Sequence, residues 1–255
     1  MKTISLLNMK GGVGKTTMSI NLAEGMHMKG KSVLLIDLDP QANTTSMYLD
    51  EVDVTVKDII AEGKPGEKVA VEVKKGFWLI PSELSLSNAE LELRMNAGVP
   101  QHNRLKKSIQ AIGDALKKKI DYCFIDCPPI INLLTVNAIM ASDEIIIPIK
   151  PDRFAVSGFM VTMKNIEQIR DNWDIDIDYK VLFNAVNRNN EELRITEDIR
   201  AGVAGRVFKT QIRCQPKPIA EASSQAKAVV LTEKKGIGVA EDIKRLVDEL
   251  IEGVE

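Results

Sequence analysis

A glycine-rich segment with two lysines lies near the start of the chain, between an apolar run and a helical pattern. Residues 10–17 read Lys-Gly-Gly-Val-Gly-Lys-Thr-Thr. They follow the apolar run Thr3–Asn8, they open a helical pattern over Thr16–Met28, and a second apolar run, Ser32–Ile36, comes next. Strand, helix and strand in this order predict a βαβ unit and a parallel sheet covered by helices. The glycine turn predicts a phosphate site, because glycines let backbone N–H groups converge at a helix N-terminus.

The residue types in this turn are those of a P-loop. Lys15 is predicted to reach the β- and γ-phosphates of a nucleotide, and the Thr16 hydroxyl is predicted to bind Mg²⁺. The segment departs from the ordinary pattern G-x-x-x-x-G-K-[ST], because Met9 stands where the first glycine belongs and because a second lysine, Lys10, precedes the glycines. The nucleotide-binding residues predicted here are Gly11, Gly12, Val13, Gly14, Lys15, Thr16 and Thr17.

Apolar runs alternate with helical patterns along the rest of the chain. Further strands are predicted at Phe77–Ile80, Tyr122–Ile125, Glu144–Ile149, Lys180–Val186 and Val207–Ile212. Helices are predicted at Leu84–Met95, Arg104–Lys118, Leu133–Ala141, Val156–Arg170, Glu191–Ala204 and Val239–Ile251. The segment Val52–Lys75 has the least regular pattern. We therefore expect an α/β fold with a doubly wound, mostly parallel sheet and helices on both faces, formed by residues 1–255 as one domain.

Three aspartates follow two of the predicted strands. Asp126 ends the run Tyr122–Ile125, and Asp37 and Asp39 follow the second strand of the chain. A lone aspartate at a strand end is often a turn residue or a helix cap. Ligands of open α/β sheets, however, collect at the carboxyl ends of the strands. Three carboxylates beside a P-loop therefore favour a functional site, and Thr16 and Asp126 are predicted metal ligands.

Composition excludes several classes of protein. Of the 255 residues, 44% are hydrophobic and 27% are charged, which is typical of a globular chain and not of a disordered one. No apolar run reaches eighteen residues, and the first residues lack the pattern of a signal peptide, so we expect a cytoplasmic protein. The cysteines are too few for a disulfide framework and contain no Cys-x-x-Cys pair, so they are expected to be buried thiols and not metal ligands: Cys123, Cys127 and Cys214.

Basic residues are concentrated in the last third of the chain. Between Lys180 and Arg245 there are thirteen Lys and Arg against eight Asp and Glu, whereas the rest of the chain has 21 basic and 28 acidic residues. The net charge of the whole chain is −2. Such an excess is equally compatible with solvated helix faces and with a surface that binds a polyanion.

Three segments together resemble the ParA/MinD family of deviant Walker A P-loop ATPases: KGGVGKTT, DLDPQANTTS and FIDCPP, in this order and spacing. The resemblance covers essentially the whole chain. It is closest to the ParA-type, Soj-like partition ATPases in their small form, which lacks a separate N-terminal DNA-binding domain. It implies a doubly wound P-loop domain whose ATP-bound subunits pair face to face.

The resemblance also implies roles for individual residues. Lys10 would be the signature lysine that reaches the partner's phosphates, Asp39 would orient the attacking water, and Asp37 would belong to the switch region near Mg²⁺. The adenine contacts would come from Asn184, Asn187, Arg188 and Arg213. This chain departs from the family there, because the Ile-Pro-Arg turn of many partition ATPases is replaced by Gln211-Ile212-Arg213-Cys214.

We therefore expect a Mg²⁺-dependent ATPase with ATP and Mg²⁺ as its ligands. The implied partners are a second copy of the chain, non-specific DNA and a ParB-type centromere-binding protein that stimulates hydrolysis, and the implied place is the cytoplasm at the nucleoid. The process would be plasmid or chromosome segregation. The predicted DNA-contacting residues are Lys209, Arg213, Lys217, Lys227, Lys234 and Lys235.

Two other functions remain as alternatives. A MinD-type membrane-associated positioning ATPase would need a basic amphipathic C-terminal helix, whereas the segment Arg245–Glu255 is amphipathic and acidic. For that reason no membrane partner is expected. A metabolic P-loop enzyme, such as a ligase similar to dethiobiotin synthetase, would not need Lys10.

Overall fold

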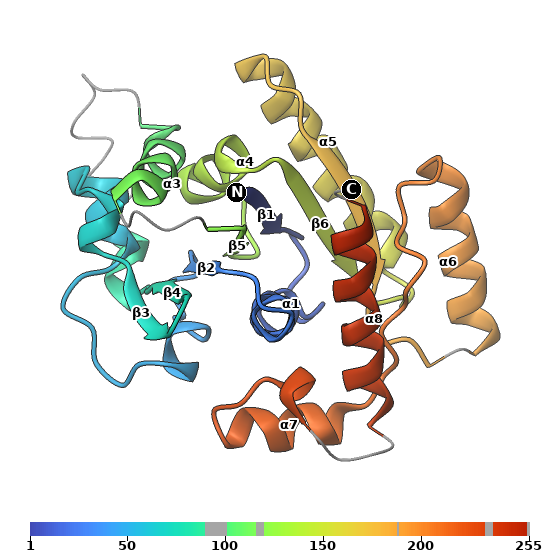
Figure 1. The fold of residues 1–255 in the computed structure, drawn as a ribbon. Helices are drawn as coiled ribbons and strands as arrows, with labels where there is room; N and C mark the ends of the chain where they lie inside the picture. Colours follow the sequence, from blue (N-terminus) through green and yellow to red (C-terminus); the bar gives the residue numbers. More distant parts are fainter. Residues whose placement is uncertain (90–100, 116–119, 188, 233–236, 254–255) are drawn as a thin grey trace.

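A seven-stranded sheet forms the centre of the structure, a computed structural model that describes residues 1–89, 101–115, 120–187, 189–232 and 237–253 (Figure 1). The strand order is β3-β4-β2-β5-β1-β6-β7, and only the pair of β3 and β4 is antiparallel among the described strands. The strands are β1 (Lys2–Leu6), β2 (Val33–Asp37), β3 (Val71–Lys74), β4 (Phe77–Ile80), β5 (Tyr122–Asp126), β6 (Glu144–Ile149) and β7 (Asp178–Phe183). The predicted mostly parallel α/β fold is confirmed.

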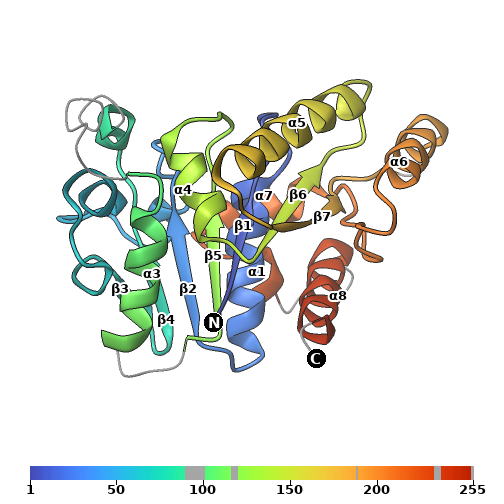
Figure 2. The same cartoon turned by 90° about the horizontal axis from the view of Figure 1, so that it is seen from above.

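Helices cover both faces of this sheet (Figures 1 and 2). One face carries α3 (Arg104–Ala115), α4 (Leu133–Ala141) and α5 (Ala155–Trp173), with α6 (Asn190–Gly202) beside α5. The other face carries α1 (Lys15–Met28), α7 (Pro216–Ser224) and α8 (Gly238–Glu252). Side chains alternate between the two layers, so that Leu34 and Ile36 of β2 join one hydrophobic cluster and Val33 and Leu35 join the other.

Short helices complete the chain. The segment predicted to be least regular contains the π-helical turn η2 (Asp58–Glu62) and the 3₁₀ turn η3 (Gly66–Lys68). It also contains β3, an edge strand that the sequence reading missed. The other 3₁₀ turns are η1 (Thr45–Met47), η4 (Leu84–Asn88) and η5 (Val229–Leu231). The helix predicted at Leu84–Met95 begins as η4, and its remainder from residue 90 lies outside the described residues.

The predicted strand Val207–Ile212 is wrong. The segment lies beside β7 and the residues that follow it, but it pairs there through isolated bridges, Val181 with Val207 and Val186 with Arg213, and not as a continuous ladder. The reason lies in α8, where the carboxylate of Glu249 accepts hydrogen bonds from the backbone N–H groups of Lys209 (2.7 Å) and Thr210 (2.9 Å). These donors are therefore lost to a regular ladder.

Helix α7 was not predicted. It begins with Pro216 and has a second proline at Pro218. Both prolines lie in the first turn, where a missing N–H costs no intrahelical hydrogen bond. By contrast, the apolar stripe of α8 is buried as expected, with Ile243, Leu246 and Leu250 each at most 2% exposed. Among the described residues, no helix has the length and apolarity needed to span a membrane.

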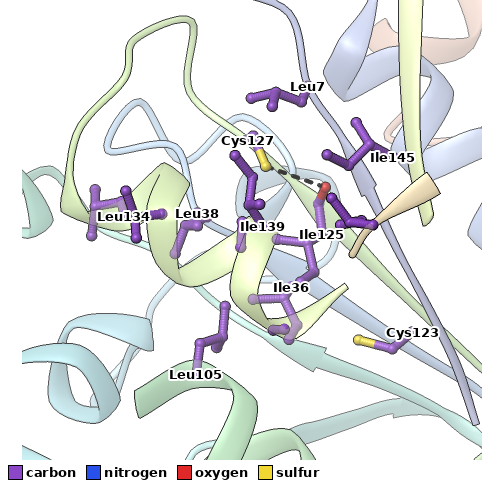
Figure 3. Close-up of a cluster of buried hydrophobic side chains, with 14 of the residues drawn as sticks. Leu7, Ile36, Leu38, Leu105, Cys123, Ile125, Cys127, Leu134, Ile139 and Ile145 are labelled. Carbon is purple, nitrogen blue, oxygen red and sulfur yellow. Dashed lines mark hydrogen bonds between the residues drawn. The ribbon is translucent and has the colours of Figure 1, made fainter. Parts of the chain in front are cut away.

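Two of the cysteines behave as predicted. Cys123 and Cys127 are buried in the cluster formed by β2, β5 and the helices above them, among Ile36, Ile125 and Leu134 (Figure 3). The Sγ atom of Cys127 lies 3.8 Å from the carbonyl oxygen of Ile125. Burial raises the pKa of both thiols, so they are inert packing groups.

Candidate functional site

The glycine-rich loop connects β1, the strand between β5 and β6, to the start of α1. Two of its glycines have positive φ angles, Gly12 at 74° and Gly14 at 93°, and Gly14 is the N-cap of α1. A Cβ atom on Gly14 would lie only 2.2 Å from Nδ2 of Asn184, so both conformation and space require glycine there. The loop thus leaves the N-terminus of α1 open for an anion, as the sequence predicts.

Lys15 is a buried lysine at the first position of α1. It is 7% exposed, and its Nζ donates to the carbonyl oxygen of Lys10 at 3.4 Å. Burial lowers the pKa of Lys15, and the nearby Asp126 carboxylate opposes this shift. A buried cation whose neighbours include a backbone carbonyl and carboxylates has capacity for a further anionic partner.

Lys10 points the other way, toward α5. Its Nζ lies 2.5 Å from each carboxylate oxygen of Asp152 and 5.9 Å from the centre of the Phe154 ring. The pair is partly exposed, at 27% for Lys10 and 37% for Asp152. Burial alone would raise the pKa of Asp152, but the hydrogen bond from Lys10 leaves it below its ordinary value. No pattern in the sequence indicates Asp152 as the partner of this lysine, since the two lie 142 positions apart.

The strand-end carboxylates Asp37 and Asp126 lie opposite each other on β2 and β5. Both are fully buried. Asp126 accepts hydrogen bonds from the hydroxyls of Thr44 (2.8 Å) and Ser19 (3.3 Å), and Thr16 is a further hydrogen-bonding neighbour. Burial raises the pKa of both carboxyl groups, and the proximity of Asp126 raises that of Asp37 further.

Asp37 is surrounded by donors from the segment that follows it. Its Oδ1 accepts from the N–H of Asp39 at 3.1 Å, and its Oδ2 accepts from both the N–H and the hydroxyl of Thr45 at 2.8 Å. Asp39 itself is half-buried and accepts from the N–H of Gln41. The three predicted aspartates are therefore brought together with Thr16, whereas Thr44, Thr45 and Ser19 were not predicted.

A pocket of about 350 Å³ opens beside the start of α1. Its walls come from α1, from residues 43–47 and from α7, and include Thr16, Thr17, Asn43, Ser46, Ile219 and Ser223. Among the described residues, no three His, Cys, Asp or Glu side chains converge as a chelating group. The set formed by Thr16 and the two carboxylates fits Mg²⁺, which binds through one or two carboxylates together with substrate phosphates and waters.

The predicted adenine residues lie in different settings. The Asn184 amide donates to the Val13 carbonyl oxygen at 2.7 Å and so braces the glycine loop. Asn187 is exposed, and both its N–H and its side chain donate to Glu192 at the start of α6. Arg188 lies outside the described residues. These amides therefore have protein partners in the ligand-free chain.

Arg213, predicted for both adenine and DNA, forms a two-pronged ion pair with Asp242 of α8. Its Nε and Nη2 lie 2.7 and 2.9 Å from the two carboxylate oxygens, and its backbone N–H donates to the same group. Although burial raises the pKa of Asp242, Arg213 leaves it below its ordinary value. The geometry gives Arg213 a structural role that holds the segment after β7 against α8.

The other predicted DNA-contacting lysines are only partly described. Lys209, Lys217 and Lys227 are exposed; Lys217 lies in the first turn of α7 and Lys227 follows that helix. The side chain of Lys217 is 86% exposed and lies 4.0 Å from Glu221. Lys234 and Lys235 lie outside the described residues.

An exposed apolar side chain, Phe154, lies beside Lys10, with its ring centre 5.9 Å from Lys10 Nζ. Phe154, Met160 and Val161, from the start of α5, are 53%, 65% and 52% exposed, and Ile130 in the loop after β5 is 51% exposed. Exposed apolar side chains near the start of one helix, where Lys10 also lies, are typical of a surface that binds protein.

Comparisons with known proteins identify the family to which the chain belongs. A family model described as "AAA domain" matches residues 1–179. The chain is 32% identical over 243 residues to the sporulation initiation inhibitor protein Soj of Bacillus subtilis, covering 93% of each chain. It is 33% identical over 244 residues to the chromosome partitioning protein ParA of Caulobacter vibrioides, covering 93% of this chain and 90% of that one.

A solved structure shares the fold. A putative plasmid partition protein from Borrelia burgdorferi bound to AMPPNP superposes with a TM-score of 0.79 at 23% identity, covering 99% of each chain. The fold, the glycine loop with its two lysines and the sequence relatives lead to one conclusion: this chain belongs to the Soj/ParA family of P-loop partition ATPases.

Proposed function

We propose that this chain is a Mg²⁺-dependent ATPase that segregates DNA, pairing with a second copy when ATP is bound and releasing DNA after hydrolysis. The observation that carries the proposal is that two lysines of one loop lie in different surroundings. Lys15 is buried beside the strand-end carboxylates, whereas Lys10 lies at the surface next to exposed apolar side chains. A P-loop that acts alone requires only the first.

The triphosphate would lie along the loop formed by Gly11, Gly12, Val13 and Gly14, and against the first turn of α1, where Thr17 follows Thr16. Thr16 and Asp126 are proposed to hold Mg²⁺, with Asp37 beside them. When bound, Mg²⁺ supplies positive charge to the phosphate oxygens. Lys15 adds charge at the β- and γ-phosphates, and its burial strengthens that interaction. A plasmid partition protein that shares the fold was crystallised with AMPPNP, which supports a nucleotide at this loop.

Asp39 is proposed to orient the water that attacks the γ-phosphate. It is half-buried, and its backbone N–H is fixed to the Asp37 carboxylate. The role needs a carboxylate held in place but not consumed as a metal ligand. Lys10 is proposed to leave Asp152 and contact the partner's phosphates, as an arginine finger does in trans.

The pairing surface is proposed to include Lys10, Ile130, Phe154, Met160 and Val161, because the four apolar side chains are exposed and Phe154 lies beside Lys10. The base would lie against the loop after β7, with Asn184, Asn187, Arg188 and Arg213 as candidate neighbours. Residues 1–255 would act as one catalytic unit.

The dimer is proposed to bind DNA without sequence preference. The candidate phosphate contacts are Lys209, Lys217, Lys227, Lys234 and Lys235. Pairing would double the basic surface that faces one duplex and so make binding depend on ATP. By the same family argument, a ParB-type protein would stimulate hydrolysis, and the protein would be cytoplasmic and nucleoid-associated.

Three measurements on the purified chain test the proposal. We expect phosphate release from ATP that requires Mg²⁺ and stops with EDTA. We expect light scattering to give a dimer with ATP and Mg²⁺ and a monomer with ADP. We expect ATP-dependent binding to DNA of unrelated sequences at low salt. Binding to anionic vesicles without binding to DNA would instead favour the membrane-associated alternative.

A further inference from the structure

Two consecutive threonines connect the segment after β2 to the two buried carboxylates of the site. The Thr44 hydroxyl donates to Asp126 Oδ2 and the Thr45 hydroxyl donates to Asp37 Oδ2, both at 2.8 Å. Thr44 is 0% exposed and Thr45 is 5% exposed. Each hydroxyl is thus a buried donor with a defined acceptor, not a surface group.

The Thr45 hydroxyl also accepts a hydrogen bond. The backbone N–H of Ser82, just after β4, donates to Thr45 Oγ1 at 2.8 Å. Since Asp37 ends β2 and Asp126 ends β5, the two hydroxyls connect the carboxyl ends of β4, β2 and β5, which are neighbours in the sheet. The segment is therefore fixed to the rigid part of the fold at both of its threonines.

The loop from Asp37 to Thr45 is closed by a single carboxylate. Oδ1 of Asp37 holds the N–H of Asp39 at the beginning of the loop, and Oδ2 holds the N–H and the hydroxyl of Thr45 at its end. Between these points Ala42 has a positive φ of 53°, and its carbonyl oxygen accepts from the N–H of Ser46. Asp39 and Thr45 are therefore held by the two oxygens of the same carboxylate.

We propose that Thr45, assisted by Thr44, is a positioning residue for ATP hydrolysis. Its hydroxyl closes the loop on Asp37 and anchors it to Ser82, and the closed loop holds Asp39 where water must be oriented. The proposal rests on the role of Asp39 in the proposed function. A catalytic group displaced by about 1 Å can lose on the order of 100-fold in rate. The phosphates, by contrast, would be held by the glycine loop, whereas the Thr45 hydroxyl contacts Asp37 and Ser82.

The test compares Thr45→Val, which keeps the shape but removes the hydroxyl, with Thr45→Ser, which keeps the hydroxyl. Thr44→Val probes the second contact. Thr196→Val is the matched control, because Thr196 is also buried and its hydroxyl donates only to the Leu193 carbonyl oxygen of α6. For each protein, kcat and KM for ATP with Mg²⁺ are measured, and nucleotide affinity is measured by fluorescence titration.

A second readout needs no nucleotide. Hydrogen exchange over residues 38–47 in the ligand-free protein reports whether the loop is closed. We expect Thr45→Val to exchange at least tenfold faster there and to lower kcat about 10- to 100-fold, with affinity changed by less than about threefold. Thr45→Ser restores both quantities, and Thr196→Val changes neither.

Each alternative result is decisive. Unchanged kcat and unchanged exchange in Thr45→Val would overturn the proposal, and so would equal losses of kcat and affinity that serine does not restore. A wild-type chain without ATPase activity would refute the proposed function instead. In that case the exchange data would still decide whether Thr45 closes the loop.

Discussion

Lys10 Nζ lies 2.5 Å from each carboxylate oxygen of Asp152, on the same surface as the exposed Phe154. The lysine that is proposed to reach a partner's phosphates is therefore bound to a carboxylate of its own chain when no nucleotide is present. When two subunits pair, Lys10 would exchange the carboxylate of Asp152 for the phosphates bound to the partner subunit. The ion pair between Lys10 and Asp152 therefore opposes dimerisation.

This competition gives a prediction for two variants. Lys10→Ala should bind nucleotide as a monomer but fail to dimerise with ATP. Asp152→Asn should strengthen dimerisation by up to about 30-fold, since each of the two subunits gives up a partly exposed ion pair that contributes about 1 kcal/mol or less. Light scattering across a concentration series with ATP and Mg²⁺ measures both effects. An undiminished dimer in Lys10→Ala would exclude a role in trans.

Asp39→Ala should separate binding from hydrolysis. We expect ATP affinity close to that of the wild type, hydrolysis reduced at least 100-fold and a dimer that persists, because the water is no longer oriented. Lys15→Ala should instead weaken nucleotide binding, because it removes a buried charge from the phosphates. Steady-state phosphate release and fluorescence titration check the pair, and wild-type turnover in Asp39→Ala would contradict the assignment.

The buried carboxyl groups predict an unusual pH dependence of stability. In the folded chain the pKa of Asp37 is raised to about 7 and that of Asp126 to about 6, mainly by burial. The folded state therefore binds more protons than the unfolded state between about pH 4 and pH 7. The unfolding free energy of the ligand-free protein should rise as pH falls through this window.

Urea unfolding between pH 5 and pH 8 measures that slope. Asp37→Asn should make it shallower. Asp58→Asn is the control, because the hydrogen bonds from Lys64 and Thr55 hold the pKa of Asp58 below its ordinary value in spite of burial, which places its titration outside the window. An equal slope in the wild type and in Asp37→Asn would mean that the carboxyl group of Asp37 does not take up a proton in this pH range.

Arg213→Ala should reduce stability more than it reduces DNA binding. It leaves Asp242, whose side chain is 6% exposed, with Arg245 as the remaining charged partner that the structure describes. A lost hydrogen bond to a charged, buried group costs about 1–2 kcal/mol, which corresponds to a melting temperature about 3–6 °C lower. Thermal melting and DNA titration decide between a structural role and a DNA-contacting role for Arg213. A lower DNA affinity at unchanged stability would show that Arg213 contacts DNA.

Charge reversal at Lys217 and Lys227 tests the DNA surface. Each neutralised phosphate contributes about −0.9 to the slope of log K against log salt, so the loss of two lysines per subunit should reduce the slope of a dimer by about 3 to 4. Lys106 and Lys107, two exposed lysines of α3, serve as the control pair. An equal effect of both pairs would mean that net charge, and not this surface, governs binding.

The parts of the fold that the sequence predicts are those in which local pattern and packing agree. The buried parallel strands are continuous apolar runs, and the glycine loop has its own composition, so the bounds of α1, β2 and β5 were found within one residue and those of β1 within two. The edge strand β3 was missed because its side chains alternate between half-buried and exposed within a polar segment. The segment after β7 was misread because Glu249, 40 positions away, takes its backbone donors.

In the site, too, the residues that belong to a local sequence pattern were predicted, and those that depend on distant contacts were not. Lys15, Thr16 and the three aspartates follow from motif and strand ends. Asp152, Thr44 and Thr45 depend on contacts between distant segments, which no spacing in the sequence reveals, although two hydroxyls after the Asp-x-Asp pair could have suggested donors to those carboxylates. The role of Asn184 as a brace for the glycine loop likewise follows only from packing.

The two borders of the sheet bear on how this protein can assemble. At one border, β3 is short, has an irregular register against β4 and carries Glu72 and Lys74 on its exposed positions. At the other, residues 206–214 occupy the outer side of β7. Charged, irregular or covered borders discourage strand addition from another molecule. If copies of this chain form filaments on DNA, we expect the contacts to run through helices and loops, so that each subunit can leave the assembly without breaking a shared sheet.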